Sequence, residues 1–183
     1  MLIAGELRKS NIAEYLLYMW QVEDLIRANG FDPDRLTAVA APGVTDAETL
    51  KSVRQWYAEL ADMMVQEGVR EKGHLQICNN VMILLSDLHA RILDSNGCSE
   101  YKHAYFSALP VIVGYRAKSD STDRSELESC FEFMYGIWML KLQGKTLSDG
   151  TADAAQRISA FLARLAAYYL REQNGDLDLE HEK

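Results

Sequence analysis

Two charged residues fall on the apolar faces of the most hydrophobic segments of this 183-residue chain. At about 100° per residue along a helix, Glu23 shares a face with apolar residues near the N-terminus, and Lys141 does so within residues 126–143. A buried charge without a partner is strongly unfavourable. We therefore expect Glu23 to pair with Lys141, with Arg27 one helical turn further on, or with Arg54.

These charges allow a functional and a structural interpretation. In the functional one, Glu23, Arg27, Lys141 and His89 are the polar groups of an interhelical pocket, in a small-molecule-binding protein or an enzyme. In the structural one, Glu23 belongs to an ion pair, and His89 is a core histidine bonded to a carbonyl or a carboxylate. We favour the structural interpretation, because structural ion networks and core histidines produce the same sequence pattern.

Two Glu-x-x-His spellings raise the question of a metal site, because some helical bundles bind metals through this motif. The first, Glu71 to His74, contains Gly73 at an expected helix break. The second, Glu100 to His103, places its histidine opposite the apolar face of its helix. Both are poor ligand sets, so no metal and no cofactor is predicted.

The sequence pattern also offers no complete set of catalytic residues. Cys98 follows an Asn-Gly turn and precedes a helix, a setting that lowers the pKa of a thiol, but only His103 is in place as a base. The sequence contains no G-x-S-x-G, no P-loop and no dinucleotide fingerprint. An enzymatic function is therefore disfavoured.

Aromatic residues of the first two long helical segments suggest a different kind of site. Tyr18 and Trp20 lie in one segment and Trp56 in the next. If they were exposed together, they would form a surface for self-association or for a protein partner. The alternative is that they belong to the core, as aromatic residues at helical spacing more often do.

The elements that position these residues are predicted to be helices, because apolar residues recur at three- and four-residue steps. Six segments show this pattern: residues 11–30, 45–68, 74–93, 99–115, 126–143 and 151–171. The sequence thus predicts a single all-α domain over residues 1–183, a bundle of five to six helices with mostly antiparallel neighbours. Residues 173–183 lack an apolar stripe and are expected to fray as an acidic tail.

Local signals refine this prediction at three places. Thr45 and Glu48 have the spacing of a capping box at the start of a helix. Pro110 interrupts a helical pattern, which predicts a kink or a split into two pieces. The segments 11–30 and 126–143 are apolar around most of their circumference, so we expect them to be central or to lie in an oligomer interface.

Composition excludes some classes of partner. The formal net charge of −8 argues against binding to nucleic acids, which requires clustered Lys and Arg, and against adsorption to anionic membranes. Residues 1–11 carry charges from the sixth position on and contain no long apolar run, so we expect neither a secretory signal nor a membrane span. We therefore expect a cytoplasmic protein whose three cysteines are free thiols.

The stretch NIAEYLLYMWQVEDLIRA (residues 11–28), led by the charged ELRKS, resembles the start of an uncharacterised family of bacterial proteins of this length, described as a domain of unknown function. The resemblance implies a stand-alone, cytoplasmic helical protein, and it brings no activity, cofactor or catalytic residue with it. Taken together, these features predict a non-enzymatic helical module that binds itself as a homodimer, or another protein. The alternative is the interhelical pocket described above.

Overall fold

The computed structural model describes residues 2–118 and 124–179. Within these ranges the chain forms eight helices, which confirms the all-α class. The helices are α1 (Leu2–Ser10), α2 (Ile12–Ala28), α3 (Pro33–Ala40), α4 (Ala47–Gln66), α5 (Gln76–Asp94), α6 (Ser99–Arg116), α7 (Glu126–Leu142) and α8 (Asp149–Gln173). The prediction of five to six helices was too low, because α1 and α3 are separate helices.

Both additional helices have local causes. The Ser10 hydroxyl donates to the Glu6 carbonyl at the end of α1, and Asn11 separates α1 from α2. At the start of α3, the Asp32 carboxylate accepts hydrogen bonds from the backbone amides of Asp34 and Arg35. Pro33 occupies the first position of α3, where its missing N–H is not needed.

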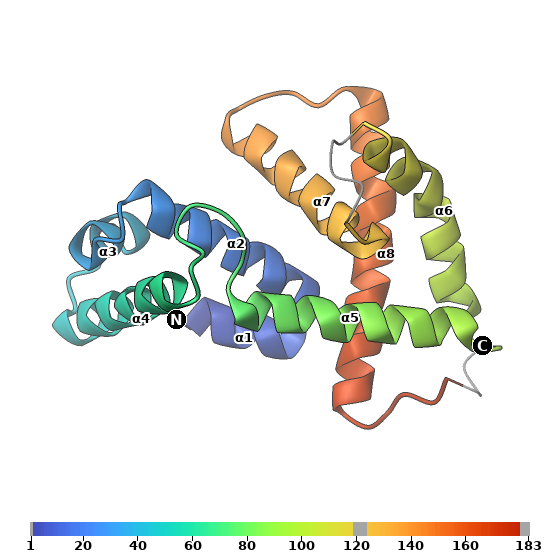
Figure 1. Cartoon of the computed structure of the whole chain (residues 1–183), viewed down its shortest axis with the longest axis horizontal. Coiled ribbons are helices and arrows are strands. Elements are labelled where there is room, and N and C mark those ends of the chain that lie inside the picture. The colour runs from blue at the N-terminus through green and yellow to red at the C-terminus, as the bar shows by residue number, and fades with distance from the viewer. Residues whose placement is uncertain (1, 119–123, 180–183) are drawn as a thin grey trace. The chain divides into compact units, whose positions relative to one another are not determined.

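The chain packs as two compact units, and each is described separately. The first comprises residues 1–10 and 14–81, and it contains α1, α3, α4, nearly all of α2 and the start of α5 (Figure 1). Within it, α3 packs against α4. Arg54 of α4 forms an ion pair with Asp34 at the start of α3, at 2.6 Å. Because the start of α3 thus lies beside a residue well inside α4, and a short connection joins the end of α3 to the start of α4, the two helices run antiparallel.

The helix cap of α4 corrects the sequence analysis by one residue. Asp46, and not Thr45, is the N-cap, because its carboxylate accepts a hydrogen bond of 2.8 Å from the Thr49 backbone amide. Asp46 thus caps the Thr49 amide, one residue beyond the Glu48 amide that a Thr45 cap would reach, and it adds a negative charge at the positive end of the helix.

The second unit comprises residues 11–13 and 82–183, in which α6, α7 and α8 pack against one another. Arg164, late in α8, forms an ion pair of 2.8 Å with Glu100 at the start of α6, so these two helices run antiparallel (Figure 1). Ser125 and Glu128 form a reciprocal capping box at the start of α7. Aromatic side chains fill much of the core between α6 and α8: Tyr101, Tyr105, Phe161 and Tyr168.

Pro110 does not split its helix. The helix α6 is continuous from Ser99 to Arg116, and its ribbon curves along its length (Figure 1). Pro110 removes one backbone hydrogen bond, the one that the Phe106 carbonyl would accept. Because Phe106 is exposed, water can reach this part of the helix. In α5, Leu84 shares the three- and four-residue spacing of the apolar residues Ile77, Val81 and Leu88, yet it is 51% exposed.

The remaining predictions about the chain as a whole have different outcomes. Within the described ranges, no helix is both long enough and apolar enough to cross a bilayer. The helix α8 ends at Gln173, residues 174–179 are not helical, and residues 180–183 of the predicted tail lie outside the described residues. The single-domain boundary of 1–183 stays a prediction.

Candidate functional site

The buried carboxylate of Glu23 contacts three groups at the start of α5, all in the first unit. Glu23 is fully buried. Its Oε2 lies 2.6 Å from Nδ1 of His74, and its Oε1 accepts a 2.9 Å hydrogen bond from the backbone amide of Leu75. The Cys78 thiol donates to the same Oε1 at 3.4 Å. Arg27 and Arg54 were therefore wrong as predicted partners: His74 contacts the Glu23 carboxylate, while Arg27 binds Asp24 and Arg54 binds Asp34.

This arrangement gives Glu23 a definite structural role. The first amides of a helix have no partner within the helix and favour a nearby negative charge. At the start of α5, Glu23 accepts from the Leu75 amide, and Glu67 accepts from the Gln76 amide at 2.6 Å. Two carboxylates from α2 and from the end of α4 thus cap the N-terminus of α5, which explains why an acid occurs on an apolar face.

The neighbours of Glu23 complete the cluster. The Trp20 ring stacks on the His74 imidazole, with ring centroids 4.2 Å apart and an angle of 13° between the planes. Burial, and then the nearby Glu23 carboxylate, raises the pKa of the Cys78 thiol. Cys78 is therefore a neutral hydrogen-bond donor and not a nucleophile at physiological pH.

Arg27 acts on the loop that precedes α5. Its Nη1 pairs with Asp24 at 2.9 Å, while its Nη2 donates to the backbone carbonyls of Val69 (3.1 Å) and Gly73. Gly73 has a φ of +87°, a conformation that favours glycine, and this allows the chain to turn beneath the guanidinium. Trp20, Glu23 and Arg27 thus form one stripe of α2 that holds the segment 69–78.

His89 lies in the second unit, in an aromatic environment. Its Nδ1 lies 2.6 Å from the Tyr101 hydroxyl, and its ring packs edge-on against Tyr105 and Phe161. The partner is thus a phenol, where a carbonyl or a carboxylate was expected. Burial lowers the pKa of His89, although Glu126 acts in the opposite sense. His89 is therefore a neutral core histidine at physiological pH.

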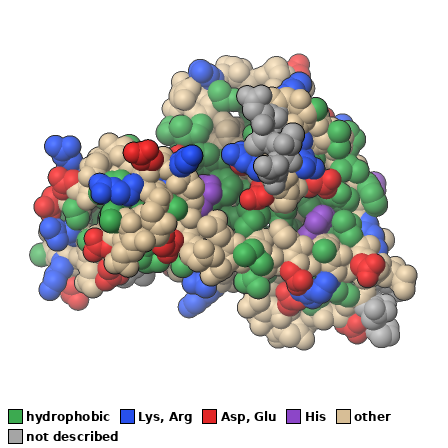
Figure 2. Space-filling view, viewed as in Figure 1, with side chains coloured by type: hydrophobic (Ala, Val, Ile, Leu, Met, Phe, Trp, Pro, Cys, Tyr) green, Lys and Arg blue, Asp and Glu red, His purple; other side chains and the backbone are tan. Residues whose placement is uncertain are grey.

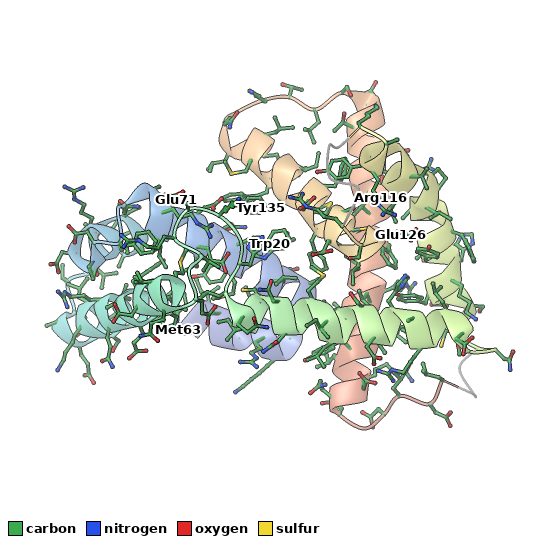
Figure 3. All side chains as sticks on the ribbon, viewed as in Figure 1. Trp20, Met63, Glu71, Arg116, Glu126 and Tyr135 are labelled. Atoms are coloured by element: carbon green, nitrogen blue, oxygen red, sulfur yellow. The ribbon has the colours of Figure 1, made fainter. Side chains whose placement is uncertain are left out.

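Next to this cluster, a short polar chain joins α6 to α7. The Tyr105 hydroxyl donates to Glu126 at 2.7 Å, and Glu126 lies 3.8 Å from Arg116. Figure 3 labels Arg116 and Glu126, which meet between the end of α6 and the start of α7. Burial, and then the hydrogen bond to Glu126, raises the pKa of Tyr105 to about 12. This phenol stays neutral and remains a donor.

Of the four residues of the predicted ligand site, Glu23 and Arg27 both contact residues 69–75, while His89 and Lys141 have other surroundings. Lys141 is exposed in the last turn of α7, where a positive charge suits the helix dipole. Glu23 and His89 are engaged with protein groups in the first and second unit, respectively. Neither these residues nor Arg27 line the aromatic-lined cavity near Trp56, the groove between α6 and α8, or the hollow beside Pro110 and Phe133. Their ligand-binding role stays a prediction.

The three aromatic residues of the predicted interaction surface are divided between two places. Trp20 is 6% exposed and belongs to the Glu23 cluster. Tyr18 and Trp56 instead line a cavity of about 460 Å³ in the first unit, which we call the aromatic cavity. Its lining consists of Ile3, Tyr18, Ala40, Asp46, Glu48, Thr49, Ser52, Val53, Trp56 and Tyr57. Sequence reasoning missed the two carboxylates, although their proximity to Trp56 along α4 was a usable signal.

A larger groove of about 790 Å³ lies between α6 and α8 in the second unit. Small side chains such as Ala104, Ser107 and Ala160 line it together with paired charges, among them Glu100 with Arg164. The sequence analysis did not identify this groove. Among the described residues, no group of three or more His, Cys, Asp or Glu side chains is placed to hold a metal ion.

Comparison with known proteins gives a family and no closer relative. Neither the curated proteins nor the solved structures include a match to the chain. The model of one family, described as a domain of unknown function (DUF4924), matches residues 1–176. The match covers the first unit, the second unit up to residue 176, and all eight of the helices described above. The chain therefore belongs to the DUF4924 family, as the resemblance of residues 11–28 indicated.

Proposed function

We propose that the protein is a non-enzymatic helical module that forms a homodimer through the outer face of α6. This face consists of Phe106, Pro110 and Val113, which follow one another at helical spacing. The observation that carries the proposal is exposure: Phe106 is 60% and Val113 is 55% exposed. The opposite face of the same helix is fully used by the core of the second unit, through Tyr101, Tyr105, Ala108 and Ile112.

Exposed apolar side chains are costly to hydrate, and a partner that covers them removes this cost. Fully burying a Phe or Val side chain contributes about 1.5–3 kcal/mol, so covering the outer face of α6 stabilises a complex. Figure 2 shows hydrophobic side chains gathered over the α6 edge of the second unit. An exposed apolar patch of this kind is typical of an interaction site.

The arrangement of the face favours a second copy of the chain as its partner. A two-fold axis places the same surface on both subunits, so that each residue meets a different residue of the other copy. With two α6 helices antiparallel around Pro110, Phe106 packs against Val113 of the partner subunit. The large and the smaller side chain then complement each other, twice in one interface.

Further observations support a non-enzymatic protein of the bacterial cytoplasm. The most deeply buried acid, Glu23, and the histidine with a lowered pKa, His89, both hydrogen-bond to protein groups. The three cysteines are buried free thiols, as a reducing compartment favours. The bacterial origin is supported by the resemblance of residues 11–28.

The test is the oligomeric state of the full chain, measured by sedimentation equilibrium over a wide concentration range. We expect a reversible dimer for the wild type and at least about tenfold weaker association for Phe106→Glu, because the charge must be desolvated in the interface. Val65→Glu is the matched control, since Val65 is a 45% exposed residue of α4 in the first unit. A wild type that stays monomeric at every concentration, or a Phe106→Glu variant that dimerises unchanged, contradicts the proposal.

A further inference from the structure

The aromatic cavity of the first unit combines three aromatic side chains with two carboxylates. Tyr18 comes from α2, while Trp56 and Tyr57 come from α4. The rings of Trp56 and Tyr57 meet edge to face, with centroids 4.9 Å apart and planes at 73°. Asp46 and Glu48, at the start of α4, complete the polar part of the lining.

The two tyrosine hydroxyls are available to a ligand. Tyr57 is only 5% exposed, yet its hydroxyl has no hydrogen-bond partner among the described residues, and the same holds for Tyr18. Burial, followed by the proximity of Tyr18, raises the pKa of Tyr57 to about 12. Burial also raises the pKa of Tyr18. Both phenols therefore stay neutral, and the charge of the cavity comes from its two acids.

The cavity has a negative character. Its lining contains Asp46 and Glu48 and no lysine, arginine or histidine. The basic residues nearby in α4 do not line it, and Arg54 is paired with Asp34. Hydrogen bonds from the Thr49 hydroxyl and amide hold the pKa of the Asp46 carboxyl below its usual range, so Asp46 stays ionised.

The helix terminus beside the cavity does not reverse this character. The start of α4 carries a partial positive charge that attracts anions. Asp46 already occupies that position, because its carboxylate accepts the hydrogen bond from the Thr49 amide. An anionic ligand would meet two carboxylates and a helix end that is already capped.

We propose that the aromatic cavity binds an organic ammonium cation, held by the rings of Tyr18, Trp56 and Tyr57 and by the carboxylates of Asp46 and Glu48. Aromatic faces attract quaternary and protonated amines through their quadrupoles, and tryptophan is the most effective of them. A volume of about 460 Å³ is in the usual range for small-molecule sites. A neutral apolar ligand would gain the ring contacts but would desolvate the carboxylates without compensation.

The charge requirement is tested with choline and its neutral isostere 3,3-dimethyl-1-butanol, titrated into the full chain by isothermal calorimetry. We expect saturable binding of choline with a Kd between about 10 μM and 1 mM, and at least about tenfold weaker binding of the isostere. A short peptide with one trimethyllysine shows whether the cation is a free small molecule or a protein side chain. Binding of either cation, with discrimination against the neutral isostere, supports the proposal.

Two pairs of variants assign the binding to the aromatic cavity. Trp56→Leu and Glu48→Gln should each weaken cation binding by about fivefold or more, since they remove a ring and a charge. Their controls are Trp138→Leu in α7 and Glu59→Gln, an exposed position of α4 outside the lining. Far-UV circular dichroism checks that each variant is folded. If Trp56→Leu does not fold, Glu48→Gln still decides whether the aromatic cavity binds the cation.

Three results would overturn the proposal: no saturable binding of any cation up to about 50 mM, equal binding of choline and its isostere, or unchanged binding in Glu48→Gln. None of these three results would bear on the proposed homodimer, because the aromatic cavity belongs to the first unit and the outer face of α6 to the second. Phe106→Glu should accordingly bind the cation as the wild type does.

Discussion

Replacing Glu23 by leucine tests whether this carboxylate holds the start of α5. Leucine has a similar volume and suits the apolar face of α2, so the change removes the acceptors without creating a large void. The Leu75 amide then loses its partner, and Leu75 is fully buried, so water cannot replace the carboxylate there. His74 is less affected, because 35% of its side chain is exposed and can be hydrated.

The magnitude follows from these contacts. A buried amide without a partner costs about 1–3 kcal/mol, and a hydrogen bond to a charged group contributes about 1.5–3 kcal/mol. The apolar surface of the new leucine offsets part of this loss, by up to about 2 kcal/mol. We expect Glu23→Leu to lower the free energy of unfolding by about 2–4 kcal/mol. Glu23→Gln should lose only about 1–2 kcal/mol, since its carbonyl can still accept from the Leu75 amide.

Urea unfolding followed by tryptophan fluorescence measures this loss in the first unit alone. Of the three tryptophans, Trp20 and Trp56 lie in the first unit and Trp138 in the second. A Trp138→Phe background therefore restricts the signal to the unit that contains Glu23. Glu59→Leu, at an exposed position of α4, is the control and should change stability by less than about 0.5 kcal/mol. If Glu23→Leu is as stable as this control, the capping role derived from the geometry is wrong.

Three further predictions concern other parts of the two units. Arg27→Lys loses the guanidinium nitrogen that donates to the Val69 and Gly73 carbonyls, so amide hydrogen exchange in residues 69–75 should become faster, with protection lower by about 1–2 kcal/mol. Unchanged exchange would show that other contacts hold this loop. Burial lowers the pKa of His89, so as the pH falls the unfolded chain binds the proton before the folded one; the contribution of His89 to the free energy of unfolding should be fully present above about pH 6.5 and decrease below it. Urea midpoints measured from about pH 5 to 8 should decrease less in His89→Gln than in the wild type. Burial raises the pKa of the Cys130 thiol to about 12 and also raises the pKa of the Cys78 thiol, so both thiols should react with a thiol reagent only after unfolding in urea. Fast labelling of the native protein at either cysteine would contradict their burial.

The sequence predicted the helices better than the partners of the residues on them. Periodicity identifies a buried face from one segment alone: in α4, Tyr57, Leu60, Ala61 and Met64 recur at three- and four-residue steps and are buried, while Leu50 and Val53 earlier in the same pattern are half-buried. Which residue contacts a given side chain depends instead on how distant segments of the chain fold onto one another. The segment 69–78 comes back to α2 through a loop, so the pairing of Glu23 with His74, 51 residues further on, had no local signal. Helical periodicity singled out the Glu23 carboxylate but gave no indication of the Leu75 amide that it caps.

The two additional helices show a different limit. Asp32 and Pro33 are a cap and a first-turn proline, which are among the clearest start signals of a helix. They fall outside the six predicted segments, where the pattern indicates at most a short turn of helix at Leu36, Val39 and Ala40, because the eight residues of α3 are too few for an apolar stripe to recur. Short helices are thus better identified from their ends than from their faces. The same is true of α4, where the cap was missed by one residue because Thr45 and Asp46 are both good caps.

Helix geometry explains why the predicted aromatic surface is divided. Side chains two residues apart on a helix are separated by about 200° around its axis, so Tyr18 and Trp20 must point to opposite sides of α2. Trp20 shares its side of α2 with Glu23 and Arg27, the stripe that holds residues 69–78. Tyr18 faces the aromatic cavity with Trp56. Within the first unit, α2 thus separates a side whose Glu23 carboxylate and Arg27 guanidinium bind the segment 69–78 from a side that lines the aromatic cavity. A variant of Tyr18 should therefore change binding in the cavity with little effect on the Glu23 cluster, whereas a variant of Trp20 should do the reverse.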